Sequence, residues 1–149
     1  MERTFVAIKP DGVKRGLIGK IIERFEDKGY KIVGLKMLHP TCEMATEHYK
    51  EHVGKPFYAG LITYITSGPI IAMAIEGQNA VANIRKVLGA TKPEEAEMGS
   101  IRADFAQTMD FNIIHGADSV LSAEREINIY FQPHEICTNW QNMLEVLTQ

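Results

Sequence analysis

The order of hydrophobic and polar positions predicts alternating strands and helices. Residues 4–8 form a short apolar run that stops at the turn 9–12, and apolar positions then recur at helical spacing over 17–25, up to Gly29. Val33, Leu35 and Met37 alternate with other residues, which predicts one face of a second strand. The first forty residues therefore indicate strand, helix and strand.

The middle of the chain continues this alternation. A helix is predicted over about 43–52, and a further helical turn or two over 58–65, between breaks at 55–56 and 67–69. Residues 70–75 are an apolar run typical of a buried strand. Asn79 is expected to cap the next helix, which ends at Gly89.

The last third begins with residues 90–110, which show no period and predict a long functional loop. Residues 111–115 are predicted to form the last strand. Asp118 or Ser119 is expected to cap a helix that reaches Phe131. Trp140 and the apolar residues at 143, 144 and 147 predict a short final helix that docks through its tryptophan. The alternation slightly favours a parallel sheet, but two strand-helix-strand units also suit a ferredoxin-like sandwich.

Composition and charge narrow the class of protein. With 149 residues, 45% hydrophobic and 23% charged, the chain is expected to form one domain rather than a fibre or a disordered chain. A net charge of −3, from 16 basic and 19 acidic residues, argues against broad binding of nucleic acid. Two distant cysteines fit a reducing compartment, and no apolar run reaches the ~18 residues of a membrane span. We therefore expect a cytoplasmic protein that needs no membrane or nucleic-acid partner.

Candidate chemistry is limited because the chain has no Walker A motif, no G-x-G-x-x-G and no G-x-S-x-G. The segment from His48 to His52 reads H-x-x-E-H, whose two histidines could share a zinc ion on one helix face, as in a zinc hydrolase. No third ligand is evident, so a polar helix face near a cleft is the simpler interpretation.

His115 ends an apolar strand just before a turn of small residues, which lifts its imidazole out of the sheet. A histidine there can attack phosphorus or carry a proton, although many such histidines only bond to backbone. Lys9, Arg85 and Arg102 could meet an anion near it, or could simply be solvated.

Five segments, taken together, resemble the nucleoside diphosphate kinases: TFVAIKPDGV at 4–13, KPFY at 55–58, SGP at 67–69, IRADF at 101–105 and NIIHG at 112–116. The block at 112–119, followed by SAERE at 122–126, is especially specific. The resemblance implies a ferredoxin-like α+β sandwich, with a four-stranded antiparallel sheet covered by helices. It also implies one domain over residues 1–149, whose tail after about residue 133 matches the family least.

The resemblance further implies an activity. The terminal phosphoryl group of a nucleoside triphosphate would pass to a nucleoside diphosphate by a ping-pong route through a phosphohistidine at His115, which maintains the pools of NTPs and dNTPs. The alternative is a non-catalytic member of the family that binds nucleotide or regulates another process.

Roles for individual residues follow from the resemblance alone. Lys9 would serve the phosphates and the ribose hydroxyl, Tyr49 would lie beside the transferring group, and Glu126 would orient His115. The other nucleotide contacts implied are phosphate oxygens for Arg85, Thr91, Arg102 and His52, the base for Phe57, Leu61 and Met109, and the ribose for Asn112. Mg²⁺ would be carried by the phosphates without protein ligands. The family also implies a homo-oligomer built from dimers, either a hexamer or a tetramer.

Two departures from the family pattern affect these expectations. Ala117 stands where the family usually has serine, which removes a hydroxyl that would support Glu126, so we expect activity that is retained but reduced. Ala103 replaces a family glycine, which matters only if that position needs a positive φ.

Overall fold

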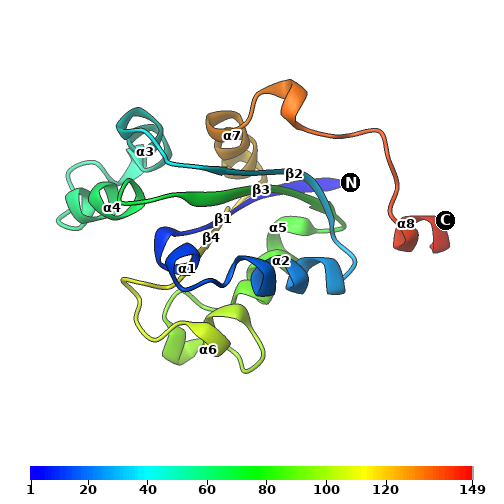
Figure 1. The fold of residues 1–149 in the computed structure, drawn as a ribbon, viewed down its shortest axis with the longest axis horizontal. Helices are drawn as coiled ribbons and strands as arrows, with labels where there is room; N and C mark the ends of the chain where they lie inside the picture. The colour runs from blue at the N-terminus through cyan, green and yellow to red at the C-terminus, as the bar shows by residue number, and fades with distance from the viewer. Residues whose placement is uncertain (149) are drawn as a thin grey trace.

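A four-stranded antiparallel sheet organises the fold (Figure 1). The computed structural model describes residues 1–148. The strands are β1 (Glu2–Ile8), β2 (Lys31–Leu38), β3 (Ile70–Gly77) and β4 (Ile114–Gly116), in the order β2-β3-β1-β4. All three neighbouring pairs are antiparallel. This confirms the ferredoxin-like arrangement and excludes the parallel sheet that the alternation slightly favoured.

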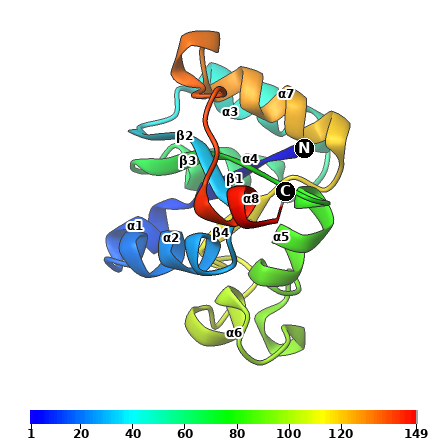
Figure 2. The same ribbon diagram turned by 90° about the vertical axis from the view of Figure 1, so that its right-hand side faces the viewer.

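Helices cover both faces of this sheet. They are α1 (Pro10–Lys14), α2 (Ile18–Asp27), α3 (Cys42–His48), α4 (Tyr58–Ile65), α5 (Ala80–Leu88), α6 (Ile101–Phe105), α7 (Val120–Tyr130) and α8 (Met143–Leu147). Short 3₁₀ turns lie at Lys50–His52, Pro93–Glu95 and Pro133–Glu135. Figures 1 and 2 show α3 and α7 on one face and α2 and α5 on the other.

The central strand β1 contributes to two hydrophobic clusters, because successive side chains of a strand point to opposite faces. Phe5 and Ala7 belong to the cluster that includes residues of α3 and α7, whereas Val6 and Ile8 belong to the cluster that includes residues of α2 and α5. Burial on both faces explains why residues 4–8 form a continuous apolar run.

Hydrogen bonds at the helix ends explain where several helices begin. The Ser119 hydroxyl accepts from the amide of Ser122 and caps α7, so the second of the two predicted caps is used. Ser100 caps α6 in the same way, and the segment 90–110 is therefore not the structureless loop that its lack of period predicted. Asn79 does precede α5, but with φ of 48° and without a side-chain cap bond.

Three further predictions about the elements were wrong in detail. The helix expected over 43–52 ends at His48, and the last strand begins at Ile114 rather than at residue 111. The pairing of β2 with β3 is irregular between Ile32 and Gly34. This β-bulge reverses the alternation, so Leu35 and Met37 do not share a face with Val33 and are 52% and 56% exposed.

Lys31 makes several of the contacts that attach the C-terminal tail, whose tryptophan is not buried. The Lys31 ammonium donates to the carbonyl of Trp140 at 2.6 Å, pairs with Glu145 at 3.3 Å and lies 5.2 Å from the centre of the Trp140 ring. Trp140 precedes α8 and remains 43% exposed. The predicted short helix is thus present, but it does not dock through a buried tryptophan. Across residues 1–148, no helix combines the length and apolar character that a membrane span requires.

Candidate active site

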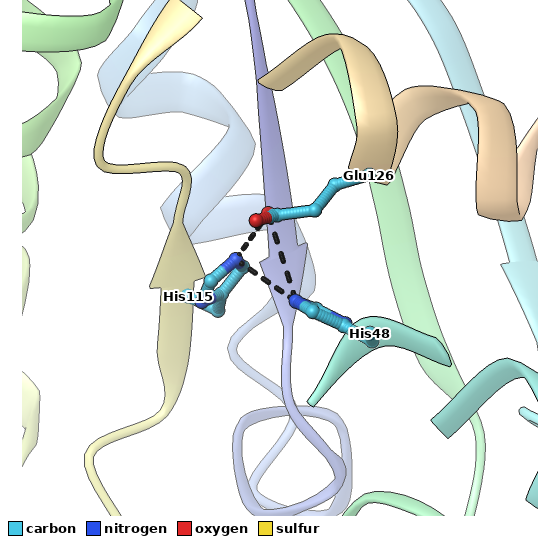
Figure 3. Close-up of side chains that lie close together, drawn as sticks. All are labelled: His48, His115 and Glu126. Carbon is cyan, nitrogen blue, oxygen red and sulfur yellow. Dashed lines mark hydrogen bonds and ion pairs between the residues drawn. The ribbon is translucent and has the colours of Figure 1, made fainter. Parts of the chain in front are cut away.

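The side chains of a histidine on β4 and a carboxylate on α7 meet over the central strand β1 (Figure 3). His115 pairs with Ala7 in the sheet, and Glu126 lies in the middle of α7 with its side chain buried. The His115 Nε2 atom is 2.6 Å from Glu126 Oε1 (Figure 3). The structure thus brings together two of the residues that the sequence analysis proposed for the site.

His48, at the end of α3, completes a group of three. Its Nε2 atom lies 3.2 Å from His115 Nε2 and 3.6 Å from Glu126 Oε1, and its Nδ1 atom lies 2.7 Å from the Tyr130 hydroxyl. Figure 3 shows the three side chains pointing toward one another from three different elements. The sequence singled out His48 only through the H-x-x-E-H pattern, and nothing in that pattern predicted His115 and Glu126 as its neighbours.

The zinc-site interpretation of H-x-x-E-H does not hold. Helix α3 ends at His48, so His48 and His52 are not neighbours on one continuous helix face. His52 Nδ1 instead lies 3.2 Å from the Lys55 ammonium, and its ring centre is 5.4 Å from that of Phe57. Within the described part of the chain, the possible metal ligands that come together are His48, His115 and Glu126.

The surroundings of His115 favour its neutral form. Burial lowers the pKa of His115 below its usual value, the hydrogen bond to Glu126 opposes this, and the nearby His48 and Lys9 add to the lowering. For Glu126, burial raises the pKa, but the hydrogen bond to His115 and the nearby His48 ring outweigh burial and keep the carboxyl ionised. An ionised carboxylate only accepts hydrogen bonds, so the His115 proton resides on Nε2 and the Nδ1 lone pair is free.

Cationic side chains lie close to this histidine. The Lys9 ammonium donates to Asn112 Oδ1 at 2.8 Å, and Arg85 donates to the Gly116 carbonyl at 3.0 Å. Burial, together with the charge of Arg102, lowers the pKa of Lys9 to about 8. Burial and then Arg85 lower the pKa of Arg102 to about 10. Like charges held this close would be stabilised by an anion between them.

Arg102 also supports the backbone around the site. Its guanidinium donates to the carbonyls of Gly89 at 2.8 Å, Ile114 at 2.6 Å and Asn112 at 3.4 Å. Ala103, next to it, is helical, so the family's glycine is not needed there for a positive φ.

One cavity of about 210 Å³ brings most of the expected site residues together. Nine of the twelve line it: Lys9, Tyr49, His52, Arg85, Thr91, Arg102, Asn112, His115 and Glu126. Phe57, Leu61 and Met109 are outside this lining; Phe57 and Met109 are each 51% exposed, and Leu61 on α4 packs against the core. The cavity therefore gathers the residues expected near the phosphates, but not the three expected at the base.

A cationic cavity beside a neutral histidine is the arrangement of a phosphotransferase site, and comparisons with known proteins agree with this class. The family profile described as "Nucleoside diphosphate kinase" matches residues 2–136. A protein of that name from Thermosynechococcus vestitus is 57% identical over 136 residues, which are 91% of each chain. Another, from Heliobacterium modesticaldum, is 56% identical over 145 residues, which are 97% of each chain.

Solved structures give the same result. A nucleoside diphosphate kinase family protein from Babesia bovis superposes with a TM-score of 0.95 at 42% identity, over 100% of both chains. A nucleoside diphosphate kinase from Halobacterium salinarum, solved in complex with CDP, superposes with a TM-score of 0.94 at 45% identity, over 99% of this chain and 98% of that one. The chain described here belongs to the nucleoside diphosphate kinase family.

Proposed function

We propose that this protein transfers the terminal phosphoryl group of a nucleoside triphosphate to a nucleoside diphosphate through a phosphohistidine at His115, and so maintains NTP and dNTP pools. The observation that carries this proposal is the 2.6 Å contact between His115 Nε2 and Glu126 Oε1. It holds the ring proton on Nε2 and leaves Nδ1 as the nucleophile.

The proposed step needs no proton transfer. The Nδ1 lone pair of His115 forms a bond to the terminal phosphorus, while the bond from phosphorus to the bridging oxygen breaks and the nucleoside diphosphate departs with that electron pair. The imidazole becomes cationic, and its Nε2 proton stays hydrogen-bonded to the ionised Glu126, which stabilises that charge. In the second step, a terminal phosphate oxygen of another nucleoside diphosphate attacks the phosphorus, the bond between phosphorus and Nδ1 breaks, and its electron pair returns to His115.

The cationic residues suit the charge that develops on the phosphoryl group, since such transfers depend on positioning and charge stabilisation. Lys9, Arg85 and Arg102 would hold phosphate oxygens. Arg102 uses three of its five N–H groups on carbonyls within the described chain, so two remain for the substrate. Tyr49, His52 and Thr91 line the same cavity and would contact the phosphates around them.

The base would lie outside the phosphate cavity. Phe57 is exposed close to the His52 ring, and an exposed aromatic ring can stack on any base. Leu61 and Met109 would flank the base, and Asn112 would contact the ribose while it also holds the Lys9 ammonium. Stacking on Phe57 would make binding tolerant of different bases.

The donors in the cavity fit Mg²⁺ only as an ion brought by the substrate. The grouped ligands His48, His115 and Glu126 offer two nitrogens and one carboxylate, whereas Mg²⁺ prefers oxygen and retains water. We propose that phosphate oxygens and water carry the ion, without ligands from protein side chains. When bound, Mg²⁺ would neutralise part of the phosphate charge.

We further propose a cytoplasmic homo-oligomer built from dimers, either a hexamer or a tetramer, which requires no membrane or nucleic acid. Exposed apolar side chains on the edge strand β2, Leu35 and Met37, and on the tail, Met143 and Leu147, support burial against another copy. Sedimentation velocity at micromolar concentration would distinguish a monomer from a dimer, tetramer or hexamer.

Labelling with [γ-³²P]ATP tests the proposed reaction. With Mg²⁺, the protein is expected to form an acid-labile phosphoprotein that loses its label when UDP or GDP is added. His115→Ala should abolish labelling and keep nucleotide binding. The matched control is His134→Ala, which removes an exposed histidine on the Pro133–Glu135 turn and should label like the wild type.

A failure to form the phosphoprotein would support the alternative function. Folded wild-type protein that binds ATP but takes up no label would identify a non-catalytic nucleotide-binding member of the family instead.

A further inference from the structure

Ile113 has an unusual backbone conformation two residues before His115. Its φ is 70°, a left-handed value that is strained for a β-branched residue, and its side chain is fully buried. The amide of Ile114 donates to the carbonyl of Asn112 at 2.8 Å, which closes a three-residue turn around Ile113. The turn sets the direction in which both Asn112 and His115 leave the backbone.

The segment after β1 holds this turn from the opposite side. The amide of Lys9 donates to the Ile113 carbonyl at 2.8 Å, and the amide of Ile113 donates to Asp11 Oδ2 at 3.1 Å. Gly12 permits the close approach: a Cβ atom there would lie 2.8 Å from Ile113 Cγ2 and 3.1 Å from the Ile113 carbonyl oxygen. Both polar backbone groups of the strained residue are therefore satisfied by this segment.

Asp11 is in turn held by α4. The Tyr64 hydroxyl donates to Asp11 Oδ1, so the two carboxylate oxygens have separate partners. The Tyr64 ring also meets the Phe111 ring edge to face, with centres 5.5 Å apart, and lies 6.0 Å from the Lys9 ammonium. A continuous chain of contacts thus runs from α4 through Asp11 to the turn that precedes His115.

We infer that Asp11 and Tyr64 are positioning residues, which hold the strained Ile113 turn and thereby place His115 and Asn112 for phosphoryl transfer. Neither side chain lines the cavity that holds His115, so they act through the backbone of Ile113. The inference rests on the proposed role of His115. A left-handed conformation at Ile113 costs free energy and persists only where the surroundings impose it. The positioning of His115 explains why this conformation is kept.

Tyr64→Phe tests the inference with the smallest change. The ring and its contact with Phe111 are kept, and only the hydroxyl bond to Asp11 is lost. We expect the single-turnover rate of His115 phosphorylation by ATP to fall roughly tenfold, as loss of a hydrogen bond to a charged group would allow. The dissociation constant for ADP should change less than this rate, because most phosphate contacts do not depend on the turn, and the melting temperature should stay close to that of the wild type.

Tyr58→Phe is the matched control, because Tyr58 starts the same helix and its hydroxyl makes no hydrogen bond within residues 1–148. It should leave the rate unchanged. Asp11→Asn retains one acceptor oxygen and should lower the phosphorylation rate at least as much as Tyr64→Phe. If Tyr64 acts through Asp11, adding Tyr64→Phe to Asp11→Asn should lower the phosphorylation rate little further.

Several results would overturn the inference. These are rates within twofold of the wild type for both variants, equal losses in Tyr64→Phe and Tyr58→Phe, or effects of the two substitutions that simply multiply. The proposed function is tested separately in the same assay, since an unlabelled wild type would refute the phosphohistidine, and with it the role given to Asp11 and Tyr64. A labelled wild type with unchanged variants would refute the positioning role alone.

Discussion

The two carboxylate oxygens of Glu126 have different neighbours. Oε1 lies 2.6 Å from His115 and 3.6 Å from His48, whereas Oε2 lies 4.0 Å from the Arg125 guanidinium. The carboxylate is therefore held mainly through one oxygen. Ala117, at the position where the family resemblance leads us to expect serine, is buried close in sequence to His115 and offers no hydroxyl for further support.

Restoring that hydroxyl should raise the rate. We expect Ala117→Ser to increase kcat by roughly 2- to 12-fold, which corresponds to one neutral hydrogen bond of about 0.5–1.5 kcal/mol. Steady-state kinetics with ATP and a second nucleoside diphosphate would measure the change. Ala123→Ser, a serine at another fully buried alanine of the same cluster, is the control and should not raise kcat. An unchanged kcat in Ala117→Ser would mean that the site has compensated for the missing hydroxyl.

The pKa of Lys9 predicts how nucleotide binding depends on pH. In the free protein, burial and then the charge of Arg102 lower this pKa from 10.5 to about 8, so Lys9 loses its proton as the pH rises through that value. A bound polyphosphate favours the charged ammonium and raises the pKa again. Binding is therefore expected to take up a proton above pH 8 and to weaken as the pH increases further.

Calorimetric titration of ADP at pH 9, in buffers of different ionisation enthalpy, would measure that proton uptake. Lys9→Arg should abolish the uptake, because arginine keeps its charge throughout this range. Equal proton uptake in Lys9→Arg and wild type would assign the titrating group to another residue.

At the scale of elements, α7 carries Glu126 and begins at a single cap. The Ser119 hydroxyl accepts the Ser122 amide at 3.0 Å. Ser119→Ala should lower the free energy of unfolding by about 1 kcal/mol, while Ser119→Gly should cost only a few tenths of that amount. Chemical denaturation of both variants would measure the difference, and equal losses would show that the hydroxyl contributes little.

Local irregularities limit what periodicity can predict about these elements. The bulge between Ile32 and Gly34 reverses the faces of β2, and the left-handed turn at Ile113 delays the start of β4. Both depend on contacts with segments distant in the sequence: β2 pairs with β3 at the bulge, and Lys9 and Asp11 hold the Ile113 turn. The capped start of α7 was predictable from Asp118 and Ser119, because a cap bond is local.

At the scale of the whole molecule, Lys31 attaches the C-terminal tail to the sheet. Its ammonium reaches Glu76, Glu145 and the Trp140 carbonyl, and its side chain is only 5% exposed. Lys31→Met is expected to destabilise the protein by about 3 kcal/mol, as removal of one partner from a buried ion pair does. It should also make the tail sensitive to proteolysis while His115 is still phosphorylated.

Lys36→Met is the control on the same strand. The ion pair between Lys36 and Glu135 is partly exposed, at 28% and 30%, and should contribute less than about 1 kcal/mol. Thermal melting and limited proteolysis of both variants would measure the difference. A tail that stays protected in Lys31→Met would show that its apolar contacts suffice.

The sequence alone determined the approximate helix and strand positions and the capped helix after His115, because spacing and cap bonds act over a few residues. It also excluded the familiar phosphate-binding loops. The family motifs added the sheet type and the site residues. Only the tertiary structure placed His48 against His115 and Glu126, Arg102 against three carbonyls, and Asp11 between Tyr64 and the Ile113 turn. These contacts join residues from separate elements, so they exist only once the sheet and both helix layers are packed.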